Sequence, residues 1–109
     1  MKNYLLGFLI LVGFSAFSQN KKKEIIEIKT SAKCEDCKDR IEKSLAFEKG
    51  VKDVKINLET AVVSVTFIPE KTNPEALRKA ISLAGYDADE IKADTKAYQA
   101  LPLCCQKGH

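Results

Sequence analysis

The sequence predicts a small α+β domain in which two helices cover one face of a four-stranded antiparallel sheet. Three observations lead to this fold class. The spacing of apolar residues switches between the period of a strand and that of a helix, in the order strand, helix, strand, strand, helix, strand. Each of the two helical segments is followed by a glycine, a common helix terminator. The length of 109 residues allows one domain and no more.

The first strand and the first helix are predicted between residues 25 and 50. Residues 25–30 are predicted to form a strand, since apolar and polar residues alternate from Ile26 to Lys29 and place Ile26 and Ile28 on one face. From Glu35 the apolar residues recur every four positions, so we expect an amphipathic helix that ends at Gly50. The buried stripe of this helix would consist of Cys37, Ile41 and Leu45.

Two further strands form a predicted hairpin. The segments 51–58 and 61–68 both alternate between apolar and polar residues, and Glu59-Thr60 lies between them as a turn. Pro69 closes the second segment because it cannot donate a hydrogen bond to a sheet. The residues facing the core would be Val54, Ile56 and Leu58 in the first segment and Val63, Val65 and Phe67 in the second.

The second helix and the last strand complete the predicted sheet. Asn73 is a good helix cap and Pro74 suits the first helical position, so the helix is expected to begin there and to end at Gly85. Its buried stripe would consist of Leu77, Ala80, Ile81 and Ala84. A weaker strand is predicted over 86–91.

This order of elements is the βαββαβ arrangement of a ferredoxin-like sandwich, predicted over residues 25–91. Residues 92–109 form a C-terminal tail, with a short helix expected over 95–101 before Pro102. Residues 19–24 form a charged leader that contains three consecutive lysines.

The first 18 residues have the layout of a secretory signal peptide. Lys2 gives a positive start, residues 4–17 are uncharged and mostly apolar, and small residues stand at positions −3 and −1 before Gln19. The apolar run is shorter than the ~20 residues of a membrane-spanning helix. We therefore expect residues 1–18 to be a cleaved signal peptide and the mature protein to be exported to a periplasm.

Composition and charge exclude several functions. The 18 Lys and Arg are offset by 15 Asp and Glu, so the net charge of +3 is too small and too mixed for a nucleic-acid-binding surface. The single histidine, His109, is terminal and a poor basis for acid–base catalysis. We expect a monomer that is not an enzyme and does not bind nucleic acid.

Four cysteines carry the chemistry of the chain. Cys34 and Cys37 form a C-x-x-C motif where the first strand meets the first helix, and Cys104 and Cys105 are adjacent near the end. An even number of cysteines in an exported chain suggests disulfides, but neither pair would close a long loop and stabilise the fold much. A helix N-terminus favours anions, so thiolates form more readily at the first pair. Paired thiolates bind soft ions such as Cu(I) and Zn(II), and by the same logic Cd(II) or Hg(II).

The segment 25–91 resembles the heavy-metal-associated domains of copper chaperones, of metal-transporting ATPases and of periplasmic mercury-binding proteins. The resemblance is carried by Cys34-Glu35-Asp36-Cys37, the helix from Ile41 to Leu45, Gly50-Val51 with Val54, the strand with Val63, Val65 and Phe67, and Leu77 and Ile81 leading to Gly85-Tyr86. It implies that Cys34 and Cys37 bind one soft metal ion and exchange it through mixed-ligand intermediates, with Tyr86 packed near the site. The implied partners are a metal-transporting membrane protein or another metal carrier.

The chain departs from this family at two positions before the C-x-x-C motif. Ala32 replaces the methionine that usually anchors the loop, and Lys33 replaces a small or hydroxyl residue. A lysine ammonium next to thiolates would lower their pKa. The loss of the methionine predicts a loop that is less firmly anchored.

The C-terminal tail could compensate for the missing methionine by supplying further metal ligands. The 13 residues from Lys92 to Cys104 would span ~20 Å as a helix, enough to return to the end of the sheet that carries the C-x-x-C motif. Cys104 and Cys105 could then complete a metal site with three or four sulfur ligands, with His109 as a further candidate. Alternatively, they form an independent redox pair or a frayed tail.

The sequence therefore predicts an exported metal-binding module that captures a soft cation, Cu(I) first and Zn(II), Cd(II) or Hg(II) next, and hands it to another protein. The candidate metal ligands are Cys34, Cys37, Cys104 and Cys105. Two alternatives stay open. One is a small exported thiol–disulfide oxidoreductase that uses Cys34 and Cys37, and the other is a domain with purely structural disulfides.

Overall fold

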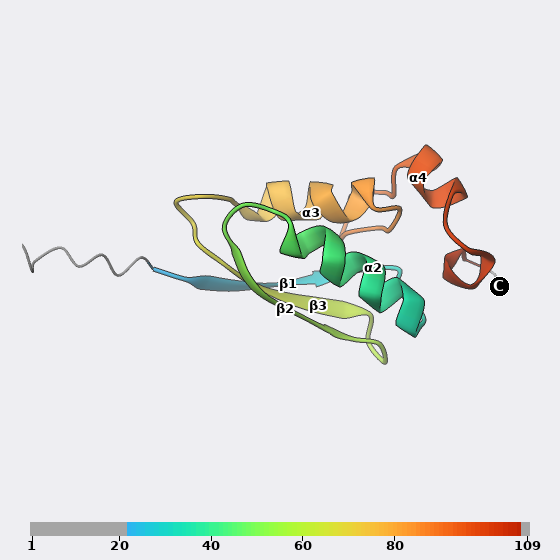
Figure 1. The fold of residues 1–109 in the computed structure, drawn as a ribbon, viewed down its shortest axis with the longest axis horizontal. Helices are drawn as coiled ribbons and strands as arrows, with labels where there is room; N and C mark the ends of the chain where they lie inside the picture. Colours follow the sequence, from blue (N-terminus) through green and yellow to red (C-terminus); the bar gives the residue numbers. More distant parts are fainter. Residues whose placement is uncertain (1–21, 108–109) are drawn as a thin grey trace, which may run out of the picture.

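The computed structural model describes residues 22–107 (Figure 1). The elements are β1 (Glu24–Lys29), α2 (Glu35–Ala46), β2 (Val51–Asn57), β3 (Val62–Phe67), α3 (Pro74–Leu83), α4 (Thr95–Gln99) and the 3₁₀ turn η1 (Leu103–Cys105). The expected signal peptide at 1–18, the first half of the charged leader (19–21) and His109 lie outside the described residues. Within 22–107, every helix is too short or too polar to cross a membrane.

The three strands form one antiparallel sheet in the order β1-β3-β2. Val65, at the centre of β3, lies opposite Ile26 on one side and Val54 on the other. Helices α2 and α3 both lie over the same face of the sheet (Figure 1). The predicted inward-facing residues of β3 and of both helices are buried in the core between these layers, except Ala84, which is half-buried. Those of β2 are half-buried at its edge.

The two main helices begin where the sequence predicts. The Asn73 side chain accepts a hydrogen bond of 2.8 Å from the backbone N–H of Ala76, as expected of a helix cap, and Pro74 is the first helical residue. Helix α2 ends at Ala46, earlier than the predicted end at Gly50. A turn over residues 47–50 follows, and the chain leaves it through Gly50, whose φ of +90° favours glycine.

The predicted fourth strand at 86–91 is wrong. The backbone N–H groups of Ala88 and Ile91 each donate to the carbonyl of the other at 2.9 Å, which closes a tight turn in place of an extended segment. Asp89 inside this turn has a φ of +53°. Only an isolated bridge between Thr30 and Ala88 remains where the strand would pair with β1, so the sheet has three strands.

The tail packs against the end of α3 and returns to the N-terminal end of α2 (Figure 1). Helix α4 begins at Thr95, as predicted, and ends at Gln99, two residues earlier than predicted. A Cβ atom on Gly85, which has a φ of +105°, would lie 3.0 Å from the Ala97 carbonyl oxygen and 3.2 Å from Leu101 Cδ1. Glycine at this position therefore lets α4 approach the end of α3 closely.

Candidate metal centre

The C-x-x-C motif lies at the N-terminus of α2. Cys34 is the residue that caps the helix, in an extended conformation, and Cys37 lies in the first turn. Cys37 is fully buried because it begins the apolar stripe that continues with Ile41 and Leu45, while Cys34 is half-buried. The two Sγ atoms are 3.2 Å apart. One thiol is thus fixed by the core, and the other lies beside it at the surface.

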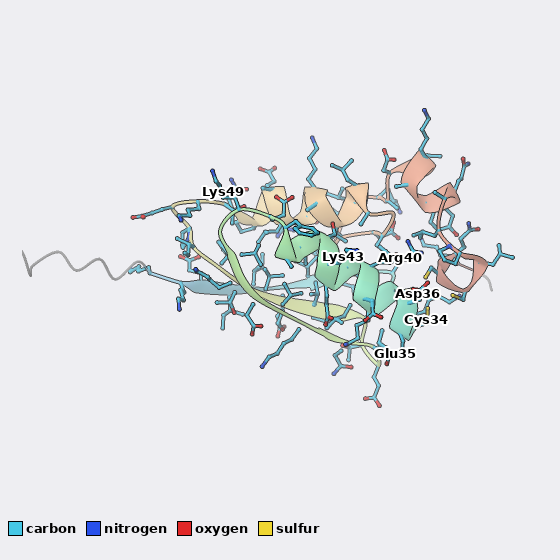
Figure 2. All side chains as sticks on the ribbon, viewed as in Figure 1. Cys34, Glu35, Asp36, Arg40, Lys43 and Lys49 are labelled. Atoms are coloured by element: carbon cyan, nitrogen blue, oxygen red, sulfur yellow. The ribbon has the colours of Figure 1, made fainter. Side chains whose placement is uncertain are left out.

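The tail brings the second cysteine pair to the same place, as predicted from its reach. The Cys34 Sγ atom lies 3.8 Å from Cys104 Sγ and 3.7 Å from Cys105 Sγ, and the two tail sulfurs are 4.0 Å apart. Figure 2 shows sulfur atoms of the C-terminal segment beside Cys34 and Asp36. The sulfurs of Cys34, Cys104 and Cys105 form a nearly equilateral triangle. Within residues 22–107, these three atoms are close enough together to hold one metal ion.

The four thiols differ in exposure and acidity. Burial opposes ionisation of Cys34, but the thiol and backbone N–H of Cys37, followed by the tail thiols, outweigh it and lower the pKa of Cys34 to about 7. The hydrogen bond with Cys34 raises the pKa of the exposed Cys104 thiol. Burial raises the pKa of Cys105. About half of Cys34 is therefore expected to be thiolate near neutral pH, next to thiols that stabilise it.

Two further groups border the cluster, the exposed Asp36 and the buried Tyr86. The Asp36 carboxylate accepts a hydrogen bond of 3.8 Å from the Cys105 thiol and lies 3.4 Å from Arg40 Nε. Tyr86 is fully buried, and its hydroxyl is without a hydrogen-bond partner in the described part of the chain. Burial, together with the neighbouring Cys105 and Cys37 thiols, raises the pKa of Tyr86, so the phenol stays neutral. Its position agrees with the packing role implied by the resemblance.

Lys33 reaches the tail. Its ammonium donates a hydrogen bond of 3.0 Å to the Gln106 carbonyl oxygen. The sequence predicts that this lysine lowers the pKa of the thiolates, whereas the structure accounts for the lowered pKa of Cys34 by the neighbouring thiols and a backbone N–H. Ala32, at the position of the missing methionine, is buried in the same apolar cluster as Leu101 and Cys105 of the tail.

Sequence reasoning missed the residues that hold the tail in place. Lys107 Nζ lies 2.6 Å from the Asp87 carboxylate, and the Lys107 backbone N–H donates to the Tyr98 hydroxyl at 2.7 Å. Burial opposes ionisation of Asp87, but Lys107 and the Ala93 N–H outweigh it and lower the pKa of this carboxyl. These residues are 9 to 20 positions apart, and neither spacing nor composition marks them as a group.

Four cysteine sulfurs around the start of a helix, on a small sheet covered by two helices, define a candidate site for a soft metal ion. The family model "heavy-metal-associated domain" matches residues 29–87, more than half of the chain. The chain therefore belongs to the heavy-metal-associated domain family.

Individual relatives agree with this assignment. A copper-exporting P-type ATPase of Staphylococcus epidermidis is 44% identical over 64 residues, which is 59% of this chain and 8% of the ATPase. Oxidized MerP from Ralstonia metallidurans superposes with a TM-score of 0.60 at 28% identity, over 62% of this chain and 96% of MerP. The CopZ metallochaperone superposes with a TM-score of 0.56 at 31% identity, over 62% of this chain and 98% of CopZ. The chain thus spans a small fraction of the curated ATPases and nearly the whole of the small solved proteins.

Proposed function

We propose that this protein is an exported, monomeric carrier of a soft metal ion and that it passes the ion on by exchange of thiolate ligands. Cu(I) is the metal we propose first. The candidate ligands are Cys34, Cys37, Cys104 and Cys105. The single observation that carries the proposal is the convergence of these sulfurs, from positions about 70 residues apart, within 3.2 to 4.0 Å of one another along the four contacts described above.

The dimensions of the sulfur triangle support Cu(I). A point at the centre of a triangle with sides of 3.7, 3.8 and 4.0 Å lies about 2.2 Å from each corner, close to the ~2.3 Å of a metal–thiolate bond. Cu(I) accepts two or three thiolates and prefers them over oxygen ligands. Cys34, Cys104 and Cys105 would therefore bind Cu(I) in trigonal geometry with little rearrangement.

Zn(II) would need four sulfur ligands at tetrahedral distances, and the sulfurs would have to move to provide them. A tetrahedral site with bonds of ~2.3 Å separates each pair of sulfurs by about 3.8 Å. The Cys34 and Cys37 Sγ atoms are only 3.2 Å apart, and Cys37 is fixed in the core. Zn(II), Cd(II) and Hg(II) remain secondary candidates, to be compared directly in the titration below.

The relatives support copper as cargo and a transporter as partner. The related ATPase is named as copper-exporting, and the structurally similar CopZ is named as a metallochaperone. We propose a metal-transporting membrane protein or another metal carrier as the partner of this chain. Export to a periplasm is proposed from the layout of residues 1–18 alone.

A titration of the reduced protein with Cu(I), in competition with a chromogenic Cu(I) chelator, tests the proposal. We expect one tightly bound ion per chain and three sulfur neighbours by X-ray absorption. Zn(II) and Cd(II) titrations under the same conditions rank the metals. Failure of Cu(I) to bind more tightly than the chelator would refute the carrier function.

A thiol–disulfide oxidoreductase is the second candidate, and one observation favours it. The pKa of Cys34 is lowered to about 7, and its sulfur lies 3.2 Å from the Cys37 sulfur that would resolve a mixed disulfide. Reduction of a small disulfide substrate by the metal-free protein, in the presence of a thiol reductant, distinguishes the two. Turnover well above that of the reductant alone would favour the oxidoreductase.

A further inference from the structure

The tail sulfurs are held over Cys34 by contacts that lie outside the sulfur cluster. The two residues after Cys105 make these contacts. The Gln106 carbonyl oxygen accepts a hydrogen bond from Lys33 Nζ at 3.0 Å. The Lys107 ammonium lies 2.6 Å from Asp87 Oδ2, and the Lys107 backbone N–H donates to the Tyr98 hydroxyl. The end of the tail is thus fastened to the loop before α2, to the loop after α3 and to α4.

Asp87 is a rigid anchor for this fastening. Its backbone N–H donates a hydrogen bond of 3.0 Å to the Ser31 hydroxyl, and its Oδ1 atom accepts one of 2.9 Å from the Ala93 backbone N–H. The backbone and one carboxylate oxygen of Asp87 are therefore each held by a hydrogen bond, and the second oxygen faces Lys107. Through Ser31, the same residue is connected to the loop that leads into the C-x-x-C motif.

Near the sulfurs, the apolar anchorage of the tail consists of Leu101 and Cys105, which are both buried in the core cluster. The other two residues of η1 are exposed, Leu103 at 63%. The residues after Cys105 are held by polar contacts, of which the ion pair between Asp87 and Lys107 is the shortest described here. This pair therefore contributes to the balance between a docked and a released tail.

We propose that the ion pair between Asp87 and Lys107 is a latch that holds Cys104 and Cys105 against Cys34, and that it thereby sets how fast the bound ion is released to an acceptor. The inference rests on the proposed metal site. The docked tail occupies the ligand positions that an acceptor's thiolate would take, so it competes with the acceptor within the same molecule. Asp87 and Lys107 are positioning residues, because neither touches the ion.

The exchange step involves no change of oxidation state. A thiolate of the acceptor forms a bond to the ion while the bond from Cys104 or Cys105 breaks, and the leaving thiolate takes a proton from water or buffer. Release of the tail makes room for the incoming thiolate. A weaker latch should therefore increase the rate of release without changing the number of ions bound.

The first test measures the transfer of Cu(I) to an excess of a chromogenic Cu(I) chelator in Asp87→Asn, in Lys107→Met and in the double variant. Asparagine keeps an oxygen that can accept from Ala93, removes the charge and replaces the oxygen that faces Lys107 by an NH2 group. We expect each single variant to release Cu(I) about two- to five-fold faster, the range of an exposed ion pair, and the double variant to match the singles. Lys38→Met is the matched control, since it removes an ion pair of 3.5 Å to Glu42 within α2 that involves neither the tail nor the loop that carries Asp87.

The second test needs no metal. Alkylation of the reduced protein by N-ethylmaleimide, followed by mass spectrometry, reports the exposure of each tail thiol. We expect Cys105 to react about two- to five-fold faster in both latch variants, while the already exposed Cys104 changes little. Faster alkylation supports the latch even if the wild-type protein binds no Cu(I), a result that would refute the carrier function alone. Unchanged alkylation and unchanged Cu(I) release in both variants would overturn the latch.

Discussion

The two halves of the sulfur cluster are built in different ways. Cys34 and Cys37 belong to a helix of 12 residues whose apolar stripe is fully buried in the core. Cys104 and Cys105 belong to a turn of three residues in which only Cys105 is buried, and polar contacts of the next two residues hold the end of the tail in place. The comparison teaches that the same ligand type can serve two purposes. On the proposed carrier function, we expect the pair at the start of α2 to supply most of the affinity and the tail pair to control the exchange of the ion.

The largest expected effect comes from the half that the core fixes. Cys34→Ser should weaken Cu(I) binding by about a hundred-fold or more, because the Cys34 sulfur is within 3.8 Å of each of the other three. Chelator competition measures the affinity. Thermal unfolding of the metal-free variant shows whether the fold is kept, which we expect for a half-buried residue. An unchanged affinity would exclude Cys34 as a ligand.

A glycine tests how the tail is joined to the core. Gly85→Ala should lower the free energy of unfolding by about 1–3 kcal/mol, because φ is +105° and the new Cβ would meet the Ala97 carbonyl. Urea unfolding measures this change. Gly50→Ala is the matched control, with a φ of +90° and a clash with Lys71, far from the tail.

The two glycine variants should differ in a second readout. Both are expected to lose stability, but only Gly85→Ala should displace α4 and expose Cys105 to alkylation. Equal protection of Cys105 in both variants would show that the position of α4 does not determine that of the tail sulfurs.

Removal of the tail sulfurs should have a smaller effect on binding than removal of Cys34. The double variant Cys104→Ser, Cys105→Ser is expected to lose about ten-fold in Cu(I) affinity, since ordering the tail offsets part of the gain from its bonds. X-ray absorption should then report two sulfur neighbours in place of three. Unchanged affinity and unchanged coordination would remove the tail from the metal site.

The pH dependence separates the two halves without mutation. The pKa of Cys34 is lowered to about 7, so its thiolate fraction is one half near pH 7 and falls to about a tenth one unit below. The pKa of Cys104 is raised, so this thiol stays protonated there. At pH 7 we expect Cys34 to react with N-ethylmaleimide faster than the more exposed Cys104. A faster reaction at Cys104 would contradict the assignment of the thiolate.

The lowered pKa of Cys34 also sets the direction in which the affinity for Cu(I) changes with pH. Protons compete with Cu(I) for the thiolates, so the apparent affinity should fall as the pH falls through about 7. Repeating the chelator competition across this range measures the change.

The smallest expected effect concerns Tyr86. Tyr86→Phe removes a buried hydroxyl that has no partner within residues 22–107, so the free energy of unfolding should change by less than about 1 kcal/mol or increase slightly. Cu(I) affinity should be unchanged. A clear loss of affinity would show that the phenol interacts with the bound ion and contributes more than packing.

Local patterns in the sequence were sufficient for most of the fold. The stripe of Cys37, Ile41 and Leu45 is buried as predicted, and Asn73 caps α3 as predicted. The failure at 86–91 has a physical reason. Alternation predicts a strand, but the backbone pairing between Ala88 and Ile91 closes a turn there, and Asp89 stabilises it by accepting hydrogen bonds from the Lys29 backbone N–H and from Arg78.

The sequence by itself determined the chemistry of the site, because thiols at the start of an amphipathic helix can be found from spacing alone. The tertiary structure decided which sulfurs lie together and what holds them there. Contacts such as those of Lys107 with Asp87 and Tyr98 join residues with no shared period or motif. They arise from the path of the tail over the end of α3, a path that depends on the whole fold.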